Sequence, residues 1–311
     1  MEKMTCFGED DRMYNGFIVE DSMKLHEISE GSESKFLILV GDTKYLVKDS
    51  SINQKRKQPS LAPFCEYVGS NFIRNSGLLK CQETYLGKYC GRDVVICKDL
   101  FPDCEFQPFK DLHQSSAGTD LESKLYTYAD VLHVLQRKAD LGTSQLQDFK
   151  RSFWLMFLFD AILGNRDRHE GNWGFVKKGG TVRLAPIFDN GSSLFPDVNL
   201  EIWNSKEFIE ERVYHMPGSQ LKMWKPGITD RPMRTNYYEI LTNYSDEFHQ
   251  ELADVQALDF NHIMIQSLKD VPQFCYNWFK TISKFRFECL ILNRNFDDVW
   301  KEYQNDWNNY I

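Results

Sequence analysis

Three polar side chains near the middle of the chain have the types and the spacing that phosphoryl transfer requires. Asp167 and Asn172 stand in an Asp-x-x-x-x-Asn sequence, and Asp189 begins an Asp-Asn-Gly sequence further along. The intervening residues 173–188 predict a β-hairpin, which would hold Asn172 and Asp189 close together. These residues could therefore bind a metal ion and act on a phosphate.

Each of the three residues has its own task in that chemistry. Transfer of a γ-phosphoryl group needs a carboxylate that orients the acceptor hydroxyl and takes its proton, and we assign Asp167 to this task. Mg²⁺ prefers hard oxygen ligands, which Asn172 and Asp189 would supply. His169 could act as a base, although we expect it to order the loop through hydrogen bonds. Asp167 alone would equally suit a helix cap or an Asx-turn, but the whole arrangement is that of a kinase catalytic loop and metal-binding turn.

The N-terminal half contains a cation that could hold the phosphates of a nucleotide. Lys48 ends a β-type run, and Glu66, on the next predicted helix, is its natural partner if the lysine faces a cleft. Ahead of that run, a loop could fold over the phosphates with its backbone N–H groups. Its candidate positions are Gly31, Ser32 and Ser34. The simpler interpretation of Lys48 is a solvated lysine at the end of a strand, and that of the loop is an ordinary surface loop.

The elements that must position these residues fall into a β-rich half and a helical half. In the first half, a helix over 61–75 lies between two hairpins, and the strands of these hairpins cover 36–40, 45–48, 83–86 and 93–97. Gly87 and Gly91 are expected in the second turn, and residues 102–122 read as a connecting region. In the second half, helices are expected near 146–163, 236–252, 258–269, 273–291 and 295–308. We therefore predict an α+β, two-lobed, protein-kinase-like fold with a small β-rich N-lobe and a larger helical C-lobe.

Composition and charge narrow the function further. The chain has 311 residues, 42% of them apolar, and a formal net charge of −8, which disfavours a generic nucleic-acid binder. Its 8 cysteines form no CxxC pair, so we expect reduced thiols rather than a zinc site or a disulfide scaffold. The most apolar stretch, residues 153–163, contains Asp160 and is too short to span a bilayer. Residues 1–12 lack the apolar region of a secretory signal, and we expect a cytoplasmic protein.

Two segments resemble a known family. The sequences DAILGNRDRHEGNWGF over residues 160–175 and LAPIFDNG over residues 184–191 resemble the C-terminal catalytic domain of HipA-like serine/threonine kinases, and above all their short, CtkA-like members. The Asp-Asn-Gly turn, with Leu-Phe-Pro behind it, also resembles the type II phosphatidylinositol 4-kinases, a structurally related group. The likeness is specific over residues 155–196 and loose over residues 24–105.

The resemblance implies an ATP site with assigned residues. Asp167 would be the catalytic base, Asn172 and Asp189 would bind Mg²⁺, and Lys48 would contact the α- and β-phosphates. Ile96 would lead into a hinge that binds adenine through its backbone. The hinge residues would be Cys97, Lys98 and Asp99.

The resemblance also implies regulation and partners. HipA proteins phosphorylate a serine of their own phosphate loop, and Ser32 and Ser34 are the positions that could be used in this way. A protein with a serine or threonine acceptor would be the substrate, and whether an antitoxin-like partner exists stays open. Residues 1–23 would be an extension, residues 24–105 the N-lobe and residues 106–311 the C-lobe. We therefore expect no counterpart here of HipA's separate N-terminal subdomain, or of the antitoxin contacts made there.

Two other functions stay open beside an ATP- and magnesium-dependent protein kinase. A phosphoinositide kinase would use the same residues but a membrane-facing patch, which the net charge of −8 disfavours. A nucleotide-binding pseudokinase or a toxin-like binding module would bind without turnover. The resemblance implies a bacterial cytoplasm, with delivery into a host cell as the alternative.

Overall fold

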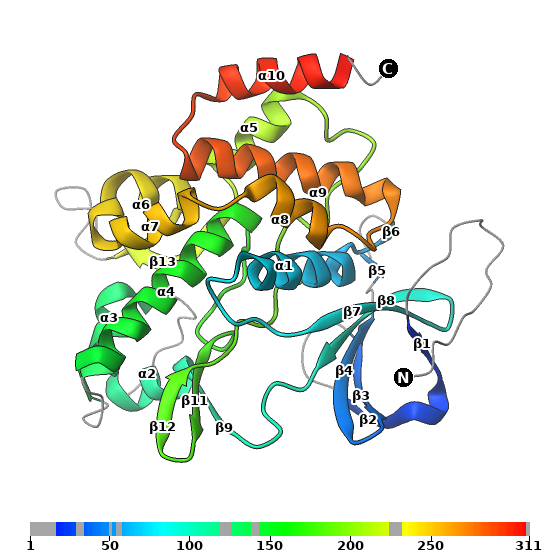
Figure 1. Ribbon diagram of the computed structural model, residues 1–311, viewed down its shortest axis with the longest axis vertical. Coiled ribbons are helices and arrows are strands. Elements are labelled where there is room, and N and C mark those ends of the chain that lie inside the picture. The colour runs from blue at the N-terminus through cyan, green and yellow to red at the C-terminus, as the bar shows by residue number, and fades with distance from the viewer. Residues whose placement is uncertain are drawn as a thin grey trace.

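A curled β-sheet at one end of the molecule is followed by a larger helical part, so the predicted α+β class is confirmed (Figure 1). The computed structural model describes residues 17–28, 34–49, 52–53, 58–117, 126–137, 143–223 and 232–308. The sheet has six strands in the order β1-β7-β8-β4-β3-β2. These strands are β1 (Phe17–Val19), β2 (Lys24–Ile28), β3 (Lys35–Val40), β4 (Thr43–Asp49), β7 (Thr84–Tyr89) and β8 (Arg92–Lys98).

The first predicted hairpin is confirmed as β3 and β4, which pair antiparallel around Gly41. Gly41 has a φ of 60°, in the left-handed region that glycine adopts without steric cost. Along β3, Phe36 and Ile38 are buried, so the alternating pattern places them on the inner face of the sheet. This register puts Lys35 directly opposite Lys48.

The second hairpin is also present, but Gly87 lies inside β7 and not in the turn. The turn residues are Cys90 and Gly91, both with positive φ. A Cβ atom on Gly87 would lie 2.7 Å from the carbonyl oxygen of Phe17, because β1 runs beside β7 at this point. Gly87 therefore permits a close approach of two strands. The pairing also shows that the sheet begins ahead of residue 24, where we predicted the N-lobe to start.

The predicted helix over 61–75 is confirmed as α1 (Ala62–Ser76), which ends at the left-handed Gly77. It lies between the sheet and the helical part of the molecule (Figure 1). Phe72 on α1 makes ring contacts with Phe159 on α4 (Thr143–Leu163) and with Phe260 on α8 (Phe260–Ser267). This helix therefore joins the two lobes through its apolar face.

Residues 102–122 are not a plain connection, which corrects the prediction. They include β9 (Glu105–Pro108) and α2 (Phe109–Ala117). β9 pairs with β11 (Gly174–Lys178), which in turn pairs with β12 (Thr181–Leu184) as the expected hairpin. The partner strand is far away in sequence, so the local proline and serine signals could not reveal the pairing.

The C-terminal helices follow the predicted order with two differences. The predicted helix over 236–252 is divided into α6 (Tyr237–Tyr244), a 3₁₀ turn (Ser245–Phe248) and α7 (His249–Gln256). A three-stranded sheet, β10-β13-β14, was not predicted. Its strands are β10 (Tyr126–Thr127), β13 (Gly218–Met223) and β14 (Met233–Asn236). The other elements are η1 (Asp21–Met23), β5 (Ile52–Asn53), β6 (Gln58–Pro59), α3 (Tyr128–Arg137), α5 (Lys206–Tyr214), α9 (Gln273–Arg286), a π-helical turn (Phe287–Ile291) and α10 (Phe296–Asn308).

The core of the helical part is built around α4. Its C-terminal half, residues 153–163, is buried on all sides, as the apolar run predicts. Asp160 lies within this run and is only 2% exposed, so its carboxylate needs buried partners. No helix in the described ranges is both long and apolar enough to cross a membrane.

Candidate active site

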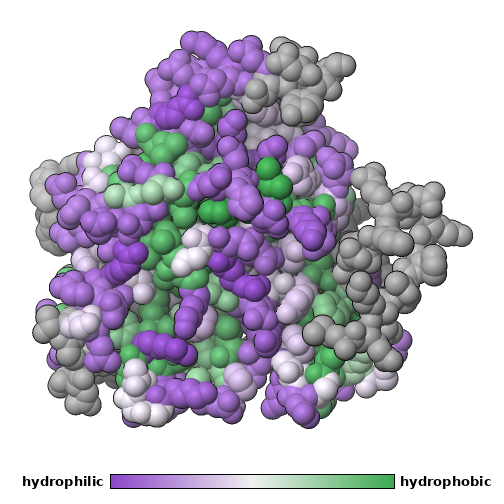
Figure 2. Space-filling view, viewed as in Figure 1, coloured by the Kyte–Doolittle hydropathy of each residue, from purple (hydrophilic) through white to green (hydrophobic). Residues whose placement is uncertain are grey.

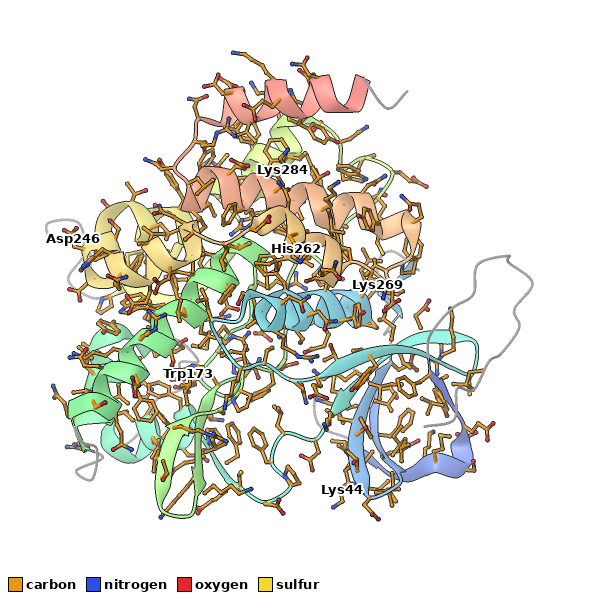
Figure 3. The ribbon with its side chains drawn as sticks, viewed as in Figure 1. Lys44, Trp173, Asp246, His262, Lys269 and Lys284 are labelled. Carbon is orange, nitrogen blue, oxygen red and sulfur yellow. The ribbon has the colours of Figure 1, made fainter. Side chains whose placement is uncertain are left out.

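The segments predicted as the catalytic loop and the metal-binding turn lie at the two ends of the β11–β12 hairpin. Asp167 and Asn172 belong to the irregular segment between α4 and β11, where Trp173 is labelled in Figure 3, and Asp189 follows β12. The Asn172 amide donates to the carbonyl of Asp167 over 2.9 Å. The Arg168 guanidinium donates to the carbonyls of both Asn172 and Phe188. The hairpin and Arg168 therefore bring the predicted residues together, as their spacing indicates.

Arg168 is one of the residues at this site that sequence reasoning missed. It is 3% exposed and forms a two-point contact with Asp160, at 3.0 Å from Nε to Oδ2 and 3.1 Å from Nη2 to Oδ1. Its Nη2 also donates to Oδ1 of Asn190 over 2.6 Å. Burial alone would lower the pKa of Arg168, but the adjacent Asp160 outweighs it and raises that pKa. A charged arginine thus fixes the loop to the turn from within the core.

Lys48 is buried, at 8% exposure, and lies between two carboxylates. Its Nζ donates to Oε2 of Glu66 over 2.9 Å and to Oδ1 of Asp189 over 2.7 Å. Burial would lower the pKa of Lys48, but the charges of Glu66 and Asp189 outweigh it and hold the pKa well above its ordinary value. The lysine is therefore charged, as a group that holds phosphates must be.

Asp189 combines charge with access. The Lys48 ammonium, aided by Arg168, lowers the pKa of Asp189 from 3.8 to about 2, although burial acts in the opposite direction. The Asp189 side chain is 41% exposed, whereas Glu66 is 1% exposed. Its φ of 58° is a left-handed conformation that few non-glycine residues adopt, and such strain is concentrated at functional sites. The ionised carboxylate can therefore meet a ligand from outside.

Glu66 holds the turn as well as the lysine. Its Oε1 accepts from the backbone N–H of Asn190, and its Oε2 accepts from that of Gly191, both over 2.9 Å. The turn after β12 is thus anchored to α1 of the N-terminal part by a buried carboxylate.

We expect Glu66→Ala to lower the free energy of unfolding by about 3–5 kcal/mol, because it removes one of the two carboxylates that pair with the buried Lys48 ammonium and leaves two N–H groups without their acceptor. Urea unfolding at neutral pH measures this loss. Glu83→Ala is the matched control, since the Lys98–Glu83 pair has a similar distance of 3.1 Å but side chains 42% and 38% exposed. An exposed ion pair contributes about 0–1 kcal/mol to the free energy of unfolding. Equal losses in the two variants would contradict the anchoring role of Glu66.

Asp167 and His169 occupy the loop in different ways. The backbone N–H of Asp167 donates to Oδ1 of Asn165 over 3.0 Å, and its half-buried side chain has no hydrogen bond to another described residue. Nδ1 of His169 accepts from the N–H of Gly171 over 3.0 Å. A Cβ atom on Gly171 would lie 2.9 Å from the His169 ring, so this contact requires glycine. These contacts favour loop ordering for His169, as predicted, and leave the Asp167 carboxylate open to a substrate.

The residues predicted to form a hinge lie in and just after a paired strand. Ile96, Cys97 and Lys98 lie within β8, paired with β7 and β4. The backbone N–H of Lys98 donates to the backbone carbonyl of Glu83, and that of Asp99 donates to the backbone carbonyl of Lys44, each over 2.9 Å. The backbone N–H groups of Lys98 and Asp99 therefore already have acceptors. These hydrogen bonds disfavour the prediction that the two groups bind adenine.

Three half-buried aromatic rings, which sequence reasoning missed, follow that strand and precede Asp189. Phe101 stacks on Phe106 with ring centroids 4.6 Å apart, and the Phe188 ring packs edge-on against both. The space-filling view shows a notch between the two lobes on the shown face, with apolar surface on both sides (Figure 2). Aromatic rings of this kind can pack against a flat ligand.

The phosphate loop is only partly described. Gly31 and Ser32 lie outside the described residues, whereas Ser34 is exposed and its carbonyl accepts from the N–H of Asp49 over 3.0 Å. Lys35 was also missed in the sequence. It lies opposite Lys48 on the same face of the sheet, and its charge contributes to the lowered pKa of Asp189. The site thus has a second cation close to the first.

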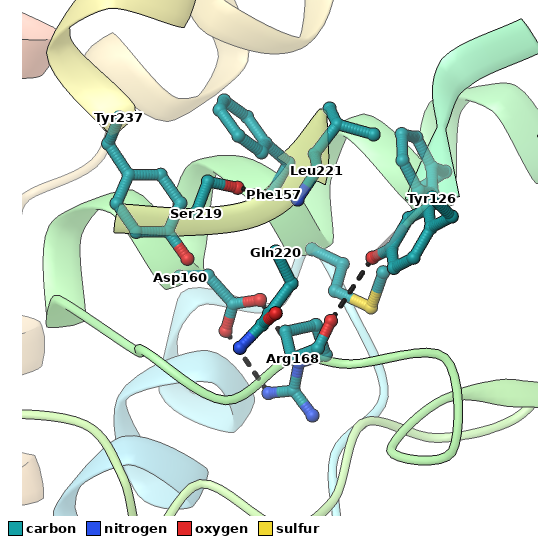
Figure 4. Close-up of a pocket in the computed structure, with 10 residues that line it drawn as sticks. Tyr126, Phe157, Asp160, Arg168, Ser219, Gln220, Leu221 and Tyr237 are labelled. Carbon is teal, nitrogen blue, oxygen red and sulfur yellow. Dashed lines mark hydrogen bonds and ion pairs between the residues drawn. The ribbon is translucent and has the colours of Figure 1, made fainter. Parts of the chain in front are cut away.

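A separate hollow lies behind the catalytic loop (Figure 4). Its cavity volume is about 10 Å³, roughly room for one water molecule, whereas sites for drug-sized ligands have about 300–1,000 Å³. Its lining includes Asp160, Arg168 and Tyr237, and not Lys48 or Asp189. The residues predicted to hold phosphates and a metal thus lie outside this hollow.

Known proteins match this chain in sequence and in fold. The family model of the HipA-like C-terminal domain matches residues 28–229, which is more than half of the chain. This chain is a member of that family. It is 32% identical over 241 residues to the serine/threonine-protein kinase CtkA of Helicobacter pylori, which covers 74% of this chain and 71% of CtkA.

Two solved structures agree with this assignment. The crystal structure of a Helicobacter pylori proinflammatory kinase CtkA matches with a TM-score of 0.72 and 26% identity, over 86% of this chain and 91% of that one. HipA of Shewanella oneidensis MR-1, solved with HipB and its operator DNA, matches with a TM-score of 0.51 over 90% of this chain and 68% of that one. At 11% identity, the HipA match shows the fold alone. The predicted family, fold class and enzyme class are confirmed: this HipA-like chain is a phosphotransferase.

Proposed function

We propose that this chain is an ATP- and magnesium-dependent protein serine/threonine kinase of the HipA/CtkA type. The observation that carries the proposal is the buried Lys48, which joins Glu66 of α1 to Asp189 of the metal-binding turn over 2.9 and 2.7 Å. A lysine held by a helix glutamate, beside a metal-binding aspartate, is the arrangement that kinases need for transfer. The serine/threonine-protein kinase CtkA, at 32% identity, supports the same acceptor class.

The acceptor hydroxyl would be oriented by Asp167. Its carboxylate takes the proton as the oxygen attacks the γ-phosphorus, and the bond to the β-phosphate oxygen breaks. Lys48, with Lys35 opposite it on the sheet, offsets the charge on the phosphates. The Phe101, Phe106 and Phe188 rings would cover the adenine.

The donor set suits Mg²⁺. Asp189 supplies an ionised, accessible carboxylate, and Asn172 supplies an amide oxygen, because its amide nitrogen is used by the Asp167 carbonyl. The described ranges contain no group of three or more histidine, cysteine or acidic side chains placed to hold a metal. Mg²⁺ is commonly bound by one or two carboxylates together with substrate phosphates, so Asp189 and Asn172 would hold it here, and it would supply positive charge that offsets that of the phosphates.

The chain incubated with Mg²⁺ and γ-labelled ATP tests this proposal. We expect label on a serine or threonine of the protein itself or of added casein, identified by mass spectrometry, and no label when EDTA removes the metal. Ser32 or Ser34 would be the labelled position if the phosphate loop is modified. Parallel vesicles of phosphatidylinositol in phosphatidylcholine test the lipid alternative. Label in the lipid alone, or bound ATP with no transfer, would overturn the protein-kinase assignment.

A further inference from the structure

The catalytic loop is buried in large part although it has no regular secondary structure. Residues 165–173 form neither helix nor strand, yet Asn165, Arg168 and Glu170 are at most 3% exposed. Buried backbone carbonyls need hydrogen-bond donors, which a helix or sheet would normally provide. The donors for this loop must therefore come from elsewhere.

Three of them come from the β10-β13-β14 sheet and the helix that follows it. The Tyr237 hydroxyl, at the start of α6, donates to the carbonyl of Asn165 over 2.6 Å. The Gln220 amide on β13 donates to the carbonyl of Arg166 over 2.8 Å. The Tyr126 hydroxyl on β10 donates to the carbonyl of Arg168 over 3.2 Å. The three accepting carbonyls lie on both sides of Asp167.

The two hydroxyls are held rigidly. Tyr126 and Tyr237 are 3% and 2% exposed, and their rings pack against other aromatic rings of the core, including Trp173 and Phe157. Burial and the charge of Asp160 raise the pKa of both tyrosines, so each hydroxyl keeps its proton and acts as a donor. In Figure 4 the side chains of Tyr126, Gln220 and Tyr237 converge on the loop from the side of the sheet.

The other side of the loop is held by α4. Oδ1 of Asp160 accepts from the Asn165 amide over 2.9 Å, and Asn165 in turn accepts from the backbone N–H of Asp167. Asp160 also binds Arg168. The loop is therefore clamped between α4 and the β10-β13-β14 sheet, with the Asp167 backbone at the middle.

We propose that Tyr126, Gln220 and Tyr237 are positioning residues, which fix the loop backbone so that the Asp167 carboxylate meets the acceptor hydroxyl. This inference rests on the proposed kinase function. Because a shift of about 1 Å in a catalytic group can cost about 10²-fold in rate, the loss of one such donor has a measurable effect. The groups that hold ATP lie on α1, β4 and the Asp189 turn, so nucleotide binding is preserved.

Tyr237→Phe tests the proposal, with Tyr238→Phe as the matched control. Tyr238 is the next residue of α6 and is 38% exposed. We expect Tyr237→Phe to lower kcat by about 10- to 100-fold and to change KM for ATP by less than about 3-fold. Tyr238→Phe should keep both values. A folded Tyr237→Phe protein with wild-type kcat would overturn the proposal.

A kinetic double-mutant cycle separates positioning from general stability. In an Asp167→Asn background the carboxylate is absent, so Tyr237→Phe should cost less than about 2-fold in single-turnover transfer. The same factor lost in both backgrounds would show that Tyr237 acts independently of Asp167, which contradicts the proposal.

Hydrogen exchange distinguishes failure of this inference from failure of the proposed function. Tyr237→Phe should accelerate exchange at the backbone N–H groups of residues 165–172 in the protein without nucleotide, and Tyr238→Phe should not. Unchanged exchange would overturn the positioning role whatever the activity. Faster exchange in a chain whose wild type transfers no phosphate would support the clamp and reject only the kinase assignment.

Discussion

Asp167→Asn is expected to lower kcat for phosphoryl transfer by about 10³-fold while the protein still folds and binds ATP. A positioned general base accelerates a reaction by about 10²–10⁴-fold. The asparagine amide can neither take the proton nor carry the negative charge that orients the hydroxyl. The side chain of Asp167 has no hydrogen bond to another described residue, so its replacement removes no structural contact within that part of the chain. Labelled transfer under saturating ATP gives kcat, and fluorescence titration with an ATP analogue gives affinity.

Asp103→Asn is the matched control for this prediction. Asp103 is 75% exposed and pairs loosely with Lys178 at 3.7 Å, so the same change there should leave kcat and affinity at the wild-type values. Wild-type turnover in a folded Asp167→Asn protein would remove Asp167 from the reaction. Residual transfer that rises with pH would instead indicate that another base, such as His169, had taken the proton.

The residues of this site differ in how far the sequence could specify them. Asp167, Asn172 and Asp189 could be assigned because a short hairpin connects them, so their proximity follows from local structure. Lys35 could also have been found, because the β3–β4 turn at Gly41 fixes the register that places it opposite Lys48.

Other contacts depend on long-range packing that no local pattern contains. In the sequence, nothing distinguishes Arg168 from the other charged residues. Its role follows from the contacts with Asp160 and Asn190 that form in the core. β9 exists only because β11 pairs with it, and its sequence reads as a loop. The strand that begins the sheet ahead of residue 24 also depends on long-range pairing. β1 has only three residues, and its parallel pairing with β7 stabilises it.

Asp189→Ala is expected to abolish metal-dependent transfer, with a loss of about 10³-fold or more, while the protein stays folded. The change removes the accessible carboxylate that would hold Mg²⁺, and charge stabilisation by such an ion is worth several kcal/mol in the transition state. Lys48 keeps Glu66 as a partner at 2.9 Å, so the buried ammonium is still paired. Titration of activity with MgCl₂ measures the effect. Asp93→Ala is the control, because Asp93 pairs with Lys88 at the same 2.7 Å outside the candidate site and should be dispensable for transfer.

The acid stability of the same variant tests the pairing independently of activity. In the folded protein the pKa of Asp189 is lowered from 3.8 to about 2, mainly by Lys48, so folding favours the ionised form. The resulting stabilisation is fully present above about pH 4 and is lost as the pH falls towards 2. Urea unfolding at pH 5 and pH 3 should therefore show a smaller acid loss for Asp189→Ala than for the wild type. Equal acid losses in the two proteins would contradict the Lys48–Asp189 pair, and Mg²⁺-dependent activity retained by Asp189→Ala would contradict the metal site.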